Sequence, residues 1–165
     1  MKYTQVVILL TILGSLAACN PGAHQVEKNK FSGLWTLLII EKQDSISGEW
    51  NEWRNGLQGY ILYDDKDNMA VHLTSKGYQN TDLVFKNLID TVSIEELKYL
   101  TQSYVYFAKY TVFEDEKIIE HARISHSNPN EWNKVVQRYY EFSGDTLRLT
   151  TVENPDSPLR VTWIK

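Results

Sequence analysis

The stretch that decides the fold is Gly59-Tyr60-Ile61-Leu62-Tyr63, then Asp64-Asp65-Lys66-Asp67-Asn68, then Met69-Ala70-Val71-His72-Leu73. Two short apolar runs flank a polar segment of turn-forming residues, which is the pattern of a β-hairpin. A calcium loop of the EF-hand type is excluded, because it needs Gly at its sixth position and Glu at its twelfth, where this chain has Met69 and Ser75. The stretch therefore predicts two antiparallel strands joined by a turn.

The same pattern repeats on both sides of this hairpin. Further strands are expected over residues 33–41, 104–113, 117–125, 135–142, 146–152 and 159–164. A capping box over Ser93-Ile94-Glu95-Glu96 predicts a short helix, because the Ser93 and Glu96 side chains can each accept a hydrogen bond from a free backbone N–H. A second helical piece is expected over residues 82–89 from the spacing of their apolar side chains. The chain is thus predicted to be all-β, a barrel or a sandwich with one or two short helices between strands.

The first residues predict export. Lys2 precedes an uncharged stretch over residues 6–18, which has the length of a signal-peptide core with its cleavage box and is shorter than the roughly 20 residues that span a bilayer. Leu16-Ala17-Ala18-Cys19 resembles the bacterial lipobox, which implies cleavage before Cys19 and attachment to its thiol of a diacylglyceryl group that carries fatty acids such as palmitate. An ordinary signal peptide that contains a cysteine is the alternative. Cys19 is the only cysteine, so an intramolecular disulfide and a cysteine-based metal site are excluded.

Three segments are expected. Residues 1–18 form the signal peptide, residues 19–32 the lipidated cysteine with a flexible tether, and residues 33–165 one barrel domain. The expected location is the bacterial cell envelope, with the membrane as a partner through the lipid on Cys19. Asn20 favours the outer membrane over the inner one, where an aspartate would favour retention. A net charge of −4 argues against a nucleic-acid partner, which requires a basic face.

Several motifs along the chain carry a family resemblance. Gly33-Leu34-Trp35 resembles the Gly-x-Trp signature of the lipocalins. Further matches are Gly59–Asp64, Asn68–Val71, Ser93–Glu96, Tyr104–Val112 and Gln137–Leu147. In this order they resemble the bacterial lipocalin-like domain family over about residues 33–151. The chain departs from it at Ala108, where the family usually has Gly, and at Ala122, where a second histidine often follows the one at His121.

This resemblance implies an antiparallel, lipocalin-like up-and-down barrel of about eight strands, and it implies a fold more than an activity. It also gives Gly33 and Trp35 structural roles at one end of the barrel. Arg160, from the last strand, is expected to stack on Trp35.

Alternation along the strands predicts which side chains face the interior. The inward sets are Tyr104, Tyr106, Ala108, Tyr110 and Val112; Val136, Arg138, Tyr140 and Phe142; and Met69, Val71 and Leu73. Arg138 is the most informative of these residues, because a buried guanidinium cannot lose its proton and requires a partner. Three alternatives remain open for it. It pairs with Glu120 or Glu141 or stacks on an aromatic ring, it binds the anionic head of an amphiphile such as a fatty acid, or a one-residue slip of the strand places it outside.

His121 shares a strand face with Arg123. If that face is inward, His121 is expected to titrate near neutral pH inside the barrel. The histidines show no spacing such as His-x-x-x-His, and neither a metal nor a cofactor is expected.

The leading expectation for function is a membrane-anchored, non-catalytic binding protein for a small apolar or anionic amphipathic ligand. Its pocket residues would be Tyr106, Tyr110, Arg138, Tyr140 and His121. One alternative is a structural or interaction lipoprotein whose barrel is filled by its own aromatic side chains. Another is an isomerase or hydrolase acting on a lipophilic substrate, with His121 or Tyr110 as its acid or base.

Overall fold

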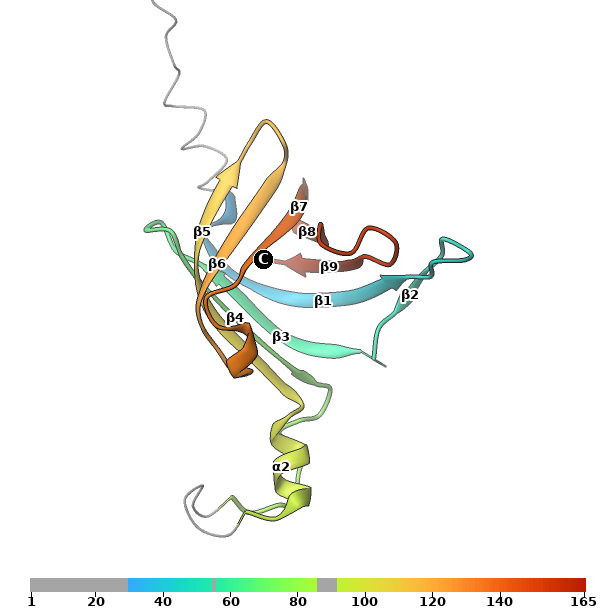
Figure 1. The fold of residues 1–165 in the computed structure, drawn as a ribbon, viewed down its shortest axis with the longest axis vertical. Helices are drawn as coiled ribbons and strands as arrows, with labels where there is room; N and C mark the ends of the chain where they lie inside the picture. The colour runs from blue at the N-terminus through green and yellow to red at the C-terminus, as the bar shows by residue number, and fades with distance from the viewer. Residues whose placement is uncertain (1–29, 55, 86–91) are drawn as a thin grey trace, which may run out of the picture.

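The computed structural model describes residues 30–54, 56–85 and 92–165, and within them the chain forms one antiparallel sheet (Figure 1). The predicted signal peptide and Cys19 lie outside the described residues. The strands are β1 (Gly33–Gln43), β2 (Trp50–Glu52), β3 (Leu57–Tyr63), β4 (Asn68–Ser75), β5 (Ser103–Phe113), β6 (Ile118–His126), β7 (Val135–Ser143), β8 (Thr146–Thr151) and β9 (Leu159–Ile164). A short helix α2 (Ile94–Leu100) lies between β4 and β5, and a 3-10 turn η1 (Pro129–Glu131) lies between β6 and β7.

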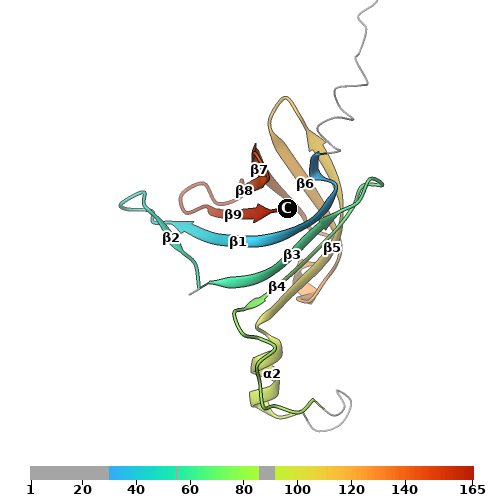
Figure 2. The ribbon, with the colours of Figure 1, turned by 180° about the vertical axis from the view of Figure 1, so that it is seen from behind.

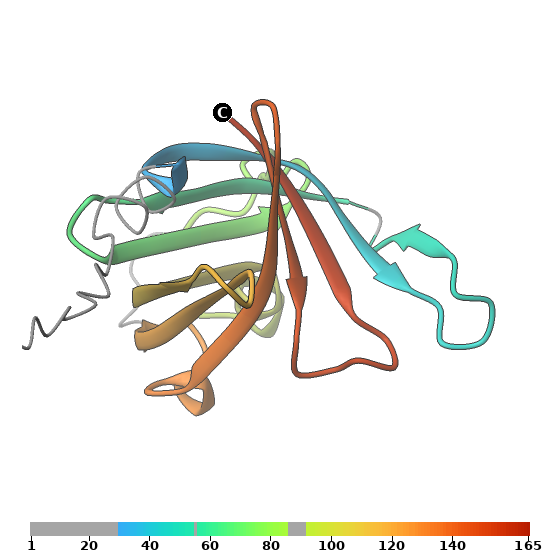
Figure 3. The ribbon, with the colours of Figure 1, turned by 90° about the horizontal axis from the view of Figure 1, so that it is seen from above.

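The sheet closes into a barrel. Its strand order is β2-β1-β3-β4-β5-β6-β7-β8-β9, and β1 also pairs with β9, so every strand except β2 belongs to the closed ring. β2 pairs only with the far end of β1, and their hairpin projects to the side, as Figure 3 shows in cyan. The predicted up-and-down barrel is therefore confirmed, and the short strand β2 is an addition to it.

Turn chemistry explains the hairpin that decides the fold. The Asp64 carboxylate accepts hydrogen bonds from the backbone N–H groups of Lys66 and Asn68, at 2.8 and 2.7 Å, and from the Asn68 side chain. This is the local bonding with which aspartate stabilises a turn. β3 and β4 then pair in full register from Tyr63 with Met69 to Leu57 with Ser75. The predicted hairpin is confirmed.

One of the two predicted helices is present among the described residues. The Ser93 Oγ accepts from the Glu96 N–H at 3.2 Å, and the Glu96 carboxylate accepts from the Ser93 N–H at 2.6 Å, so the capping box before α2 is complete. Residues 82–85 of the second expected helix carry no helical structure, and residues 86–89 lie outside the described part. Figures 1 and 2 show α2 extending beyond the end of the barrel, away from the sheet.

The two ends of the barrel differ. At one end, which we call the Phe31 end, the chain enters β1, and the β3–β4, β5–β6 and β7–β8 turns lie there as well. The opposite end, which we call the Arg123 end, carries the β1–β2 hairpin, the connection through α2, and η1. Gly33 begins β1 with a φ of 121°, a backbone conformation that favours glycine. This supports the structural role expected for it.

The core is densest at the Phe31 end. The Phe31 ring makes edge contacts with Tyr63, Tyr140 and Phe142, at centroid distances of 5.4, 5.0 and 4.8 Å. Phe31 is fully buried, so the folded domain begins before residue 33. The predicted tether over residues 19–32 therefore extends too far toward the C-terminus. The physical reason is that Phe31 closes the barrel at this end, where its backbone carbonyl also accepts a hydrogen bond from the buried indole of Trp35 at 2.7 Å.

The expected stacking of Arg160 on Trp35 is wrong. The Arg160 guanidinium instead lies over the ring of Trp50, at 4.0 Å from its centroid, and binds the Glu41 carboxylate through two hydrogen bonds of 2.9 Å. Arg160 pairs in register with Glu41 near the Arg123 end, whereas Trp35 lies near the other end of β1. Trp35 itself is in the core as predicted, and the amine of Lys165 lies 4.8 Å from its ring centroid.

Candidate functional site

The inward faces of the strands are those that alternation predicted. Tyr106, Ala108 and Tyr110 of β5, Met69 and Val71 of β4, and Tyr140 of β7 are all buried. Arg138 pairs in register with the buried Ile119 of β6, and its side chain is 17% exposed, so it does face the interior. The alternative in which the strand is shifted by one residue is thereby excluded.

Arg138 has a partner that the sequence did not indicate. Its Nη1 donates to the Glu153 carboxylate at 2.7 Å and to the backbone carbonyl of Gln137 at 2.6 Å. The expected pairing with Glu120 or Glu141 is wrong. Glu120 accepts from the Gln137 side chain, and Glu141 pairs with Arg148. Glu153 lies beyond the end of β8, and the pairing of β7 with β8 brings it beside Arg138.

His121 is the centre of a buried hydrogen-bond chain. Its Nε2 lies 3.0 Å from the hydroxyl of Tyr63, and its Nδ1 lies 2.9 Å from the hydroxyl of Tyr106. Burial, with a smaller contribution from the positive charges of Arg138 and Arg123, lowers the pKa of His121 from 6.5 to about 3. The expectation that His121 titrates near neutral pH is therefore wrong. The imidazole is neutral, so one of its nitrogens donates to a tyrosine and the other accepts from one.

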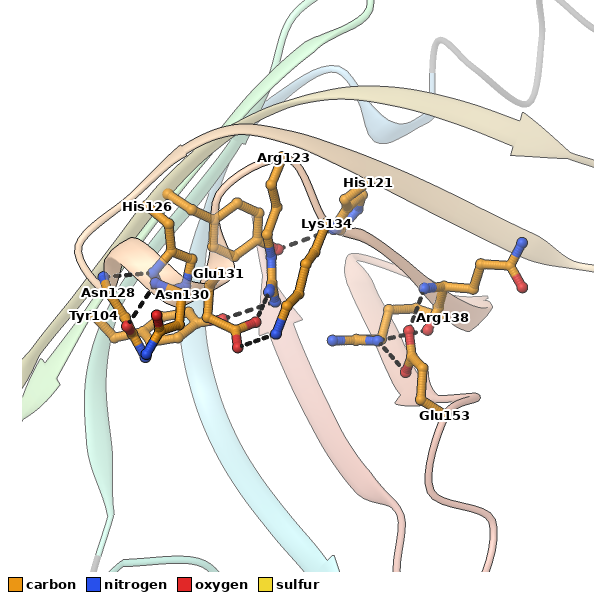
Figure 4. A network of polar contacts seen from close by, with 12 residues as sticks. Tyr104, His121, Arg123, His126, Asn128, Asn130, Glu131, Lys134, Arg138 and Glu153 are labelled. Carbon is orange, nitrogen blue, oxygen red and sulfur yellow. Dashed lines mark hydrogen bonds and ion pairs between the residues drawn. The ribbon is translucent and has the colours of Figure 1, made fainter.

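Arg123 is a second inward cation, and sequence reasoning did not include it in the site. Its side chain is 5% exposed, its Nη1 donates to Glu131 of η1 at 2.5 Å, and its Nη2 donates to the Tyr104 hydroxyl at 3.1 Å. The guanidinium carbon lies 4.9 Å from the ring centroid of Tyr106. Among the described residues, Arg123 Nε has no hydrogen-bond partner although it is buried. Figure 4 shows this cluster beside Arg138 and Glu153.

His126 adds another unpaired donor. Its Nδ1 accepts from the backbone N–H of Asn128 at 2.8 Å, so the neutral imidazole carries its proton on Nε2. Burial, followed by the charge of Arg123, lowers the pKa of His126, which favours this neutral form. Within the described part of the chain, His126 Nε2 is buried without a partner. A buried donor without a hydrogen-bond partner costs about 1–3 kcal/mol. A ligand that brings acceptor oxygens to this end of the barrel would therefore be bound more favourably.

A β-bulge explains why both Arg123 and His126 face inward. Phe107 of β5 pairs with Ser125 and the next residue, Ala108, pairs with Arg123, so Ile124 is an extra residue in β6. Strict alternation from Arg123 would turn His126 outward, and the bulge reverses this. The signal in the sequence was weak, since an irregularity of this kind leaves no fixed pattern.

Two inward-facing valines at the Arg123 end are partly exposed. Val136 pairs in register with buried His121, and Val161 pairs with buried Leu149, yet both valines are only half-buried. Inward-facing apolar side chains at this end are thus partly exposed, as is the side chain of Arg138, whereas that of Arg123 is buried.

The remaining predicted pocket residues lie deeper. Tyr110 donates to the backbone carbonyl of Asp64 at 2.7 Å, and burial raises its pKa to about 12. Tyr140 packs against Phe31. Tyr106 connects the His121 hydrogen-bond chain with the cluster around Arg123, because its hydroxyl bonds His121 and its ring stacks on that of His126 with centroids 5.8 Å apart. The structure thus joins Tyr106 to His121 by a hydrogen bond, with the charge of Arg138 close enough to act on His121. Tyr110 is the cross-strand partner of His121, and Tyr140 lies in the packed Phe31 end.

Over the described ranges, no group of three or more His, Cys, Asp or Glu side chains is arranged to hold a metal ion. None of the helices in those ranges is long and apolar enough to cross a membrane.

Comparison with known proteins places the chain in a family. The model of the lipocalin-like domain matches residues 32–161. A search of curated proteins finds no match. The match covers most of the chain and agrees with the closed antiparallel barrel and with the resemblance seen in the motifs. A barrel of this kind is suited in general to binding a small ligand. The chain therefore belongs to the lipocalin-like domain family.

Proposed function

We propose that this protein is a lipid-anchored binding protein of the bacterial envelope, which holds an anionic amphiphile such as a fatty acid in its barrel. The observation that carries the proposal is the pair of inward arginines, Arg123 and Arg138, in a barrel whose inward apolar side chains are partly exposed at the Arg123 end. A guanidinium keeps its charge at any physiological pH, and it binds a carboxylate through parallel hydrogen bonds.

The resident carboxylates leave room for exchange. Glu131 and Glu153 are 30% and 46% exposed, so each can return to water when a ligand anion takes its place. The Arg138–Glu153 pair is partly exposed on both sides, and ion pairs of this kind contribute little to stability, typically below about 1 kcal/mol. The unpaired donors Arg123 Nε and His126 Nε2 would gain acceptors from an oxygen-rich head group. The apolar tail would lie among the half-buried valines and toward Tyr106.

The neutral state of His121 favours binding over catalysis. An acid or base that works near neutral pH needs a pKa close to that pH, and the pKa of His121 is far below it. Both of its ring nitrogens are also occupied by tyrosine hydroxyls. Tyr110, the other candidate, binds a backbone carbonyl near the packed end. The residues considered for an isomerase or hydrolase are thus held in structural roles.

The barrel interior also supports a second candidate function. Aromatic rings fill the Phe31 end, where Tyr63 packs on Tyr110 with centroids 5.0 Å apart and Phe31 packs on Tyr140. If packing of this kind extended through the interior, the protein would be an interaction lipoprotein with no ligand. The half-buried inward side chains at the Arg123 end favour the ligand carrier.

Ligand binding is tested by titrating a fluorescent fatty acid into the mature chain and following quenching of the tryptophan emission. Arg138→Ala is expected to weaken binding at least tenfold, because a charge-assisted hydrogen bond to the ligand contributes about 1.5–3 kcal/mol. Arg148→Ala is the matched control. Arg148 pairs with Glu141, both side chains are exposed, and its loss is expected to leave affinity unchanged. An equal effect of both substitutions, or no binding across a panel of amphiphiles, would favour the filled barrel.

The lipid anchor needs its own test. Cells that express the full chain are fed an alkyne analogue of palmitate, and the protein is probed for the label. Wild-type protein is expected to carry the label and to sediment with membranes, and Cys19→Ala is expected to lose both properties. Separation of inner and outer membranes then tests the outer-membrane location. A label that persists without Cys19 would contradict the anchor.

A further inference from the structure

An exposed apolar row crosses the outside of the barrel. Pairing places Leu34 beside Leu62, Leu62 beside Ala70, and Ala70 beside Phe107, so the row runs over β1, β3, β4 and β5. Leu34, Leu62 and Phe107 are 57%, 44% and 52% exposed. Three strand spacings of about 4.8 Å give the row a length of roughly 14 Å.

The next outward row contains Thr36, Tyr60, His72 and Val105, and Asn68 and Lys109 flank the other side. Tyr60 faces outward in the next row and is 52% exposed, and Leu38 is 59% exposed farther along β1. We call Leu34, Leu38, Tyr60, Leu62, Ala70 and Phe107 the apolar face. The four strands pair with one another over a region that extends from Leu34–Thr36 of β1 to Val105–Lys109 of β5. None of the outward-facing residues in this region is acidic. Apolar surface that is contiguous and exposed on a soluble barrel marks an interaction site.

The opposite side of the barrel is different. There outward side chains form ion pairs and hydrogen bonds, such as Arg148 with Glu141 and Gln137 with Glu120, next to a shorter outward apolar row of Phe113, Ile118 and Tyr139. For a chain with a net charge of −4, the absence of acidic groups from one side is a marked asymmetry. The two sides therefore face different surroundings.

The position of the chain entry identifies the occupant. The described chain begins at Lys30, four residues before Leu34 of the apolar face, and Cys19 precedes Lys30 by eleven residues. Eleven residues span at most roughly 37 Å when fully extended. A lipid on Cys19 would thus hold this side of the barrel within reach of the bilayer at all times. Such tethering gives the membrane a far higher effective concentration than that of a second copy of the chain.

We infer that the apolar face lies against the bilayer surface to which Cys19 tethers the protein. This inference rests on the lipid anchor of the proposed function. Leucine and aromatic side chains suit the boundary between lipid head groups and acyl chains, and no acidic group of the face repels anionic lipids. The barrel then lies on its side. The β4–β5 connection, with Ile94 and Leu97 of α2 exposed, leaves and re-enters the sheet through strands of the same face.

The test uses the full lipidated protein in vesicles of phosphatidylethanolamine and phosphatidylglycerol at a ratio of three to one. Because Cys19 is the sole cysteine and its thiol would carry the diacylglyceryl group, Leu62→Cys or Arg148→Cys introduces one reactive thiol for an environment-sensitive fluorophore. The probe at position 62 is expected to shift to shorter wavelength and to lose at least half of its emission to spin-labelled lipids. The matched probe at position 148, on the opposite side, is expected to show neither change. Equal responses at the two positions would overturn the inference.

Two controls separate the remaining outcomes. If sedimentation without vesicles shows a dimer in which the probe at position 62 is already protected, the face binds a second copy and the inference fails. If mass spectrometry shows no lipid on Cys19, the anchor fails independently, and the two labelled proteins are prepared with Cys19→Ser, so that one thiol again remains, and mixed with excess vesicles. A response at position 62 alone would then still support the face, and no response would overturn it.

Discussion

Phe31→Ala is expected to lower the free energy of unfolding by about 3–5 kcal/mol, the usual cost of removing a buried phenylalanine ring. Phe31 is fully buried and its ring contacts Tyr63, Tyr140 and Phe142. The alanine would leave a cavity that this rigid set of rings cannot fill. Urea unfolding followed by tryptophan fluorescence measures the change, and the melting temperature is expected to fall by roughly 10 °C or more.

Phe107→Ala is the matched control for this prediction. Phe107 lies on the outside of the barrel with half of its surface exposed, so its loss is expected to cost about 0.5 kcal/mol or less. If the two substitutions had similar effects, Phe31 would not close the barrel. The result also decides where a recombinant domain should begin, because a chain that starts at Gly33 lacks Phe31, which packs this end of the barrel.

The strands could be predicted because each short strand alternates between core and solvent. Alternation correctly assigned the inward residues of β5 and β7, and turn chemistry at Asp64 and the capping box at Ser93 marked the connections. Phe31 could not be recognised in this way, because it follows a polar run and belongs to no strand of its own. Its burial depends on three strands that come later in the chain.

The candidate site was only partly predictable for a related reason. The inward direction of Arg138 follows from local alternation, whereas its partner Glu153 is set by how β8 returns beside β7. Arg160 likewise lies over Trp50 because the short strand β2 folds back on β1, and three residues give too little pattern to predict a strand. The bulge in β6 changed the direction of His126. Local periodicity thus predicts faces, and long-range pairing determines partners.

The second large effect expected is a loss of stability in mild acid that depends on His121. The folded-state pKa of His121, about 3, lies below its ordinary value of 6.5. Between these two pH values the unfolded chain therefore binds a proton at His121 and the native chain does not. Stability is therefore complete above about pH 6.5 and falls as the pH decreases toward 3. Between pH 6.5 and pH 5 the loss from this one group is about 2 kcal/mol.

Urea unfolding at pH 7.5 and pH 5 measures this loss in the wild type and in His121→Gln. The glutamine amide can still bond the Tyr63 and Tyr106 hydroxyls, but it does not titrate, so the difference between the two pH values is expected to shrink by about 2 kcal/mol. His72→Gln, at an exposed histidine on the outside of the barrel, is the matched control for replacing a histidine with glutamine. Because His126 also has a lowered pKa, some acid sensitivity remains in every variant. An unchanged difference in His121→Gln would mean that the imidazole binds its proton equally well in the folded chain, and the buried Tyr63–His121–Tyr106 chain would then be wrong.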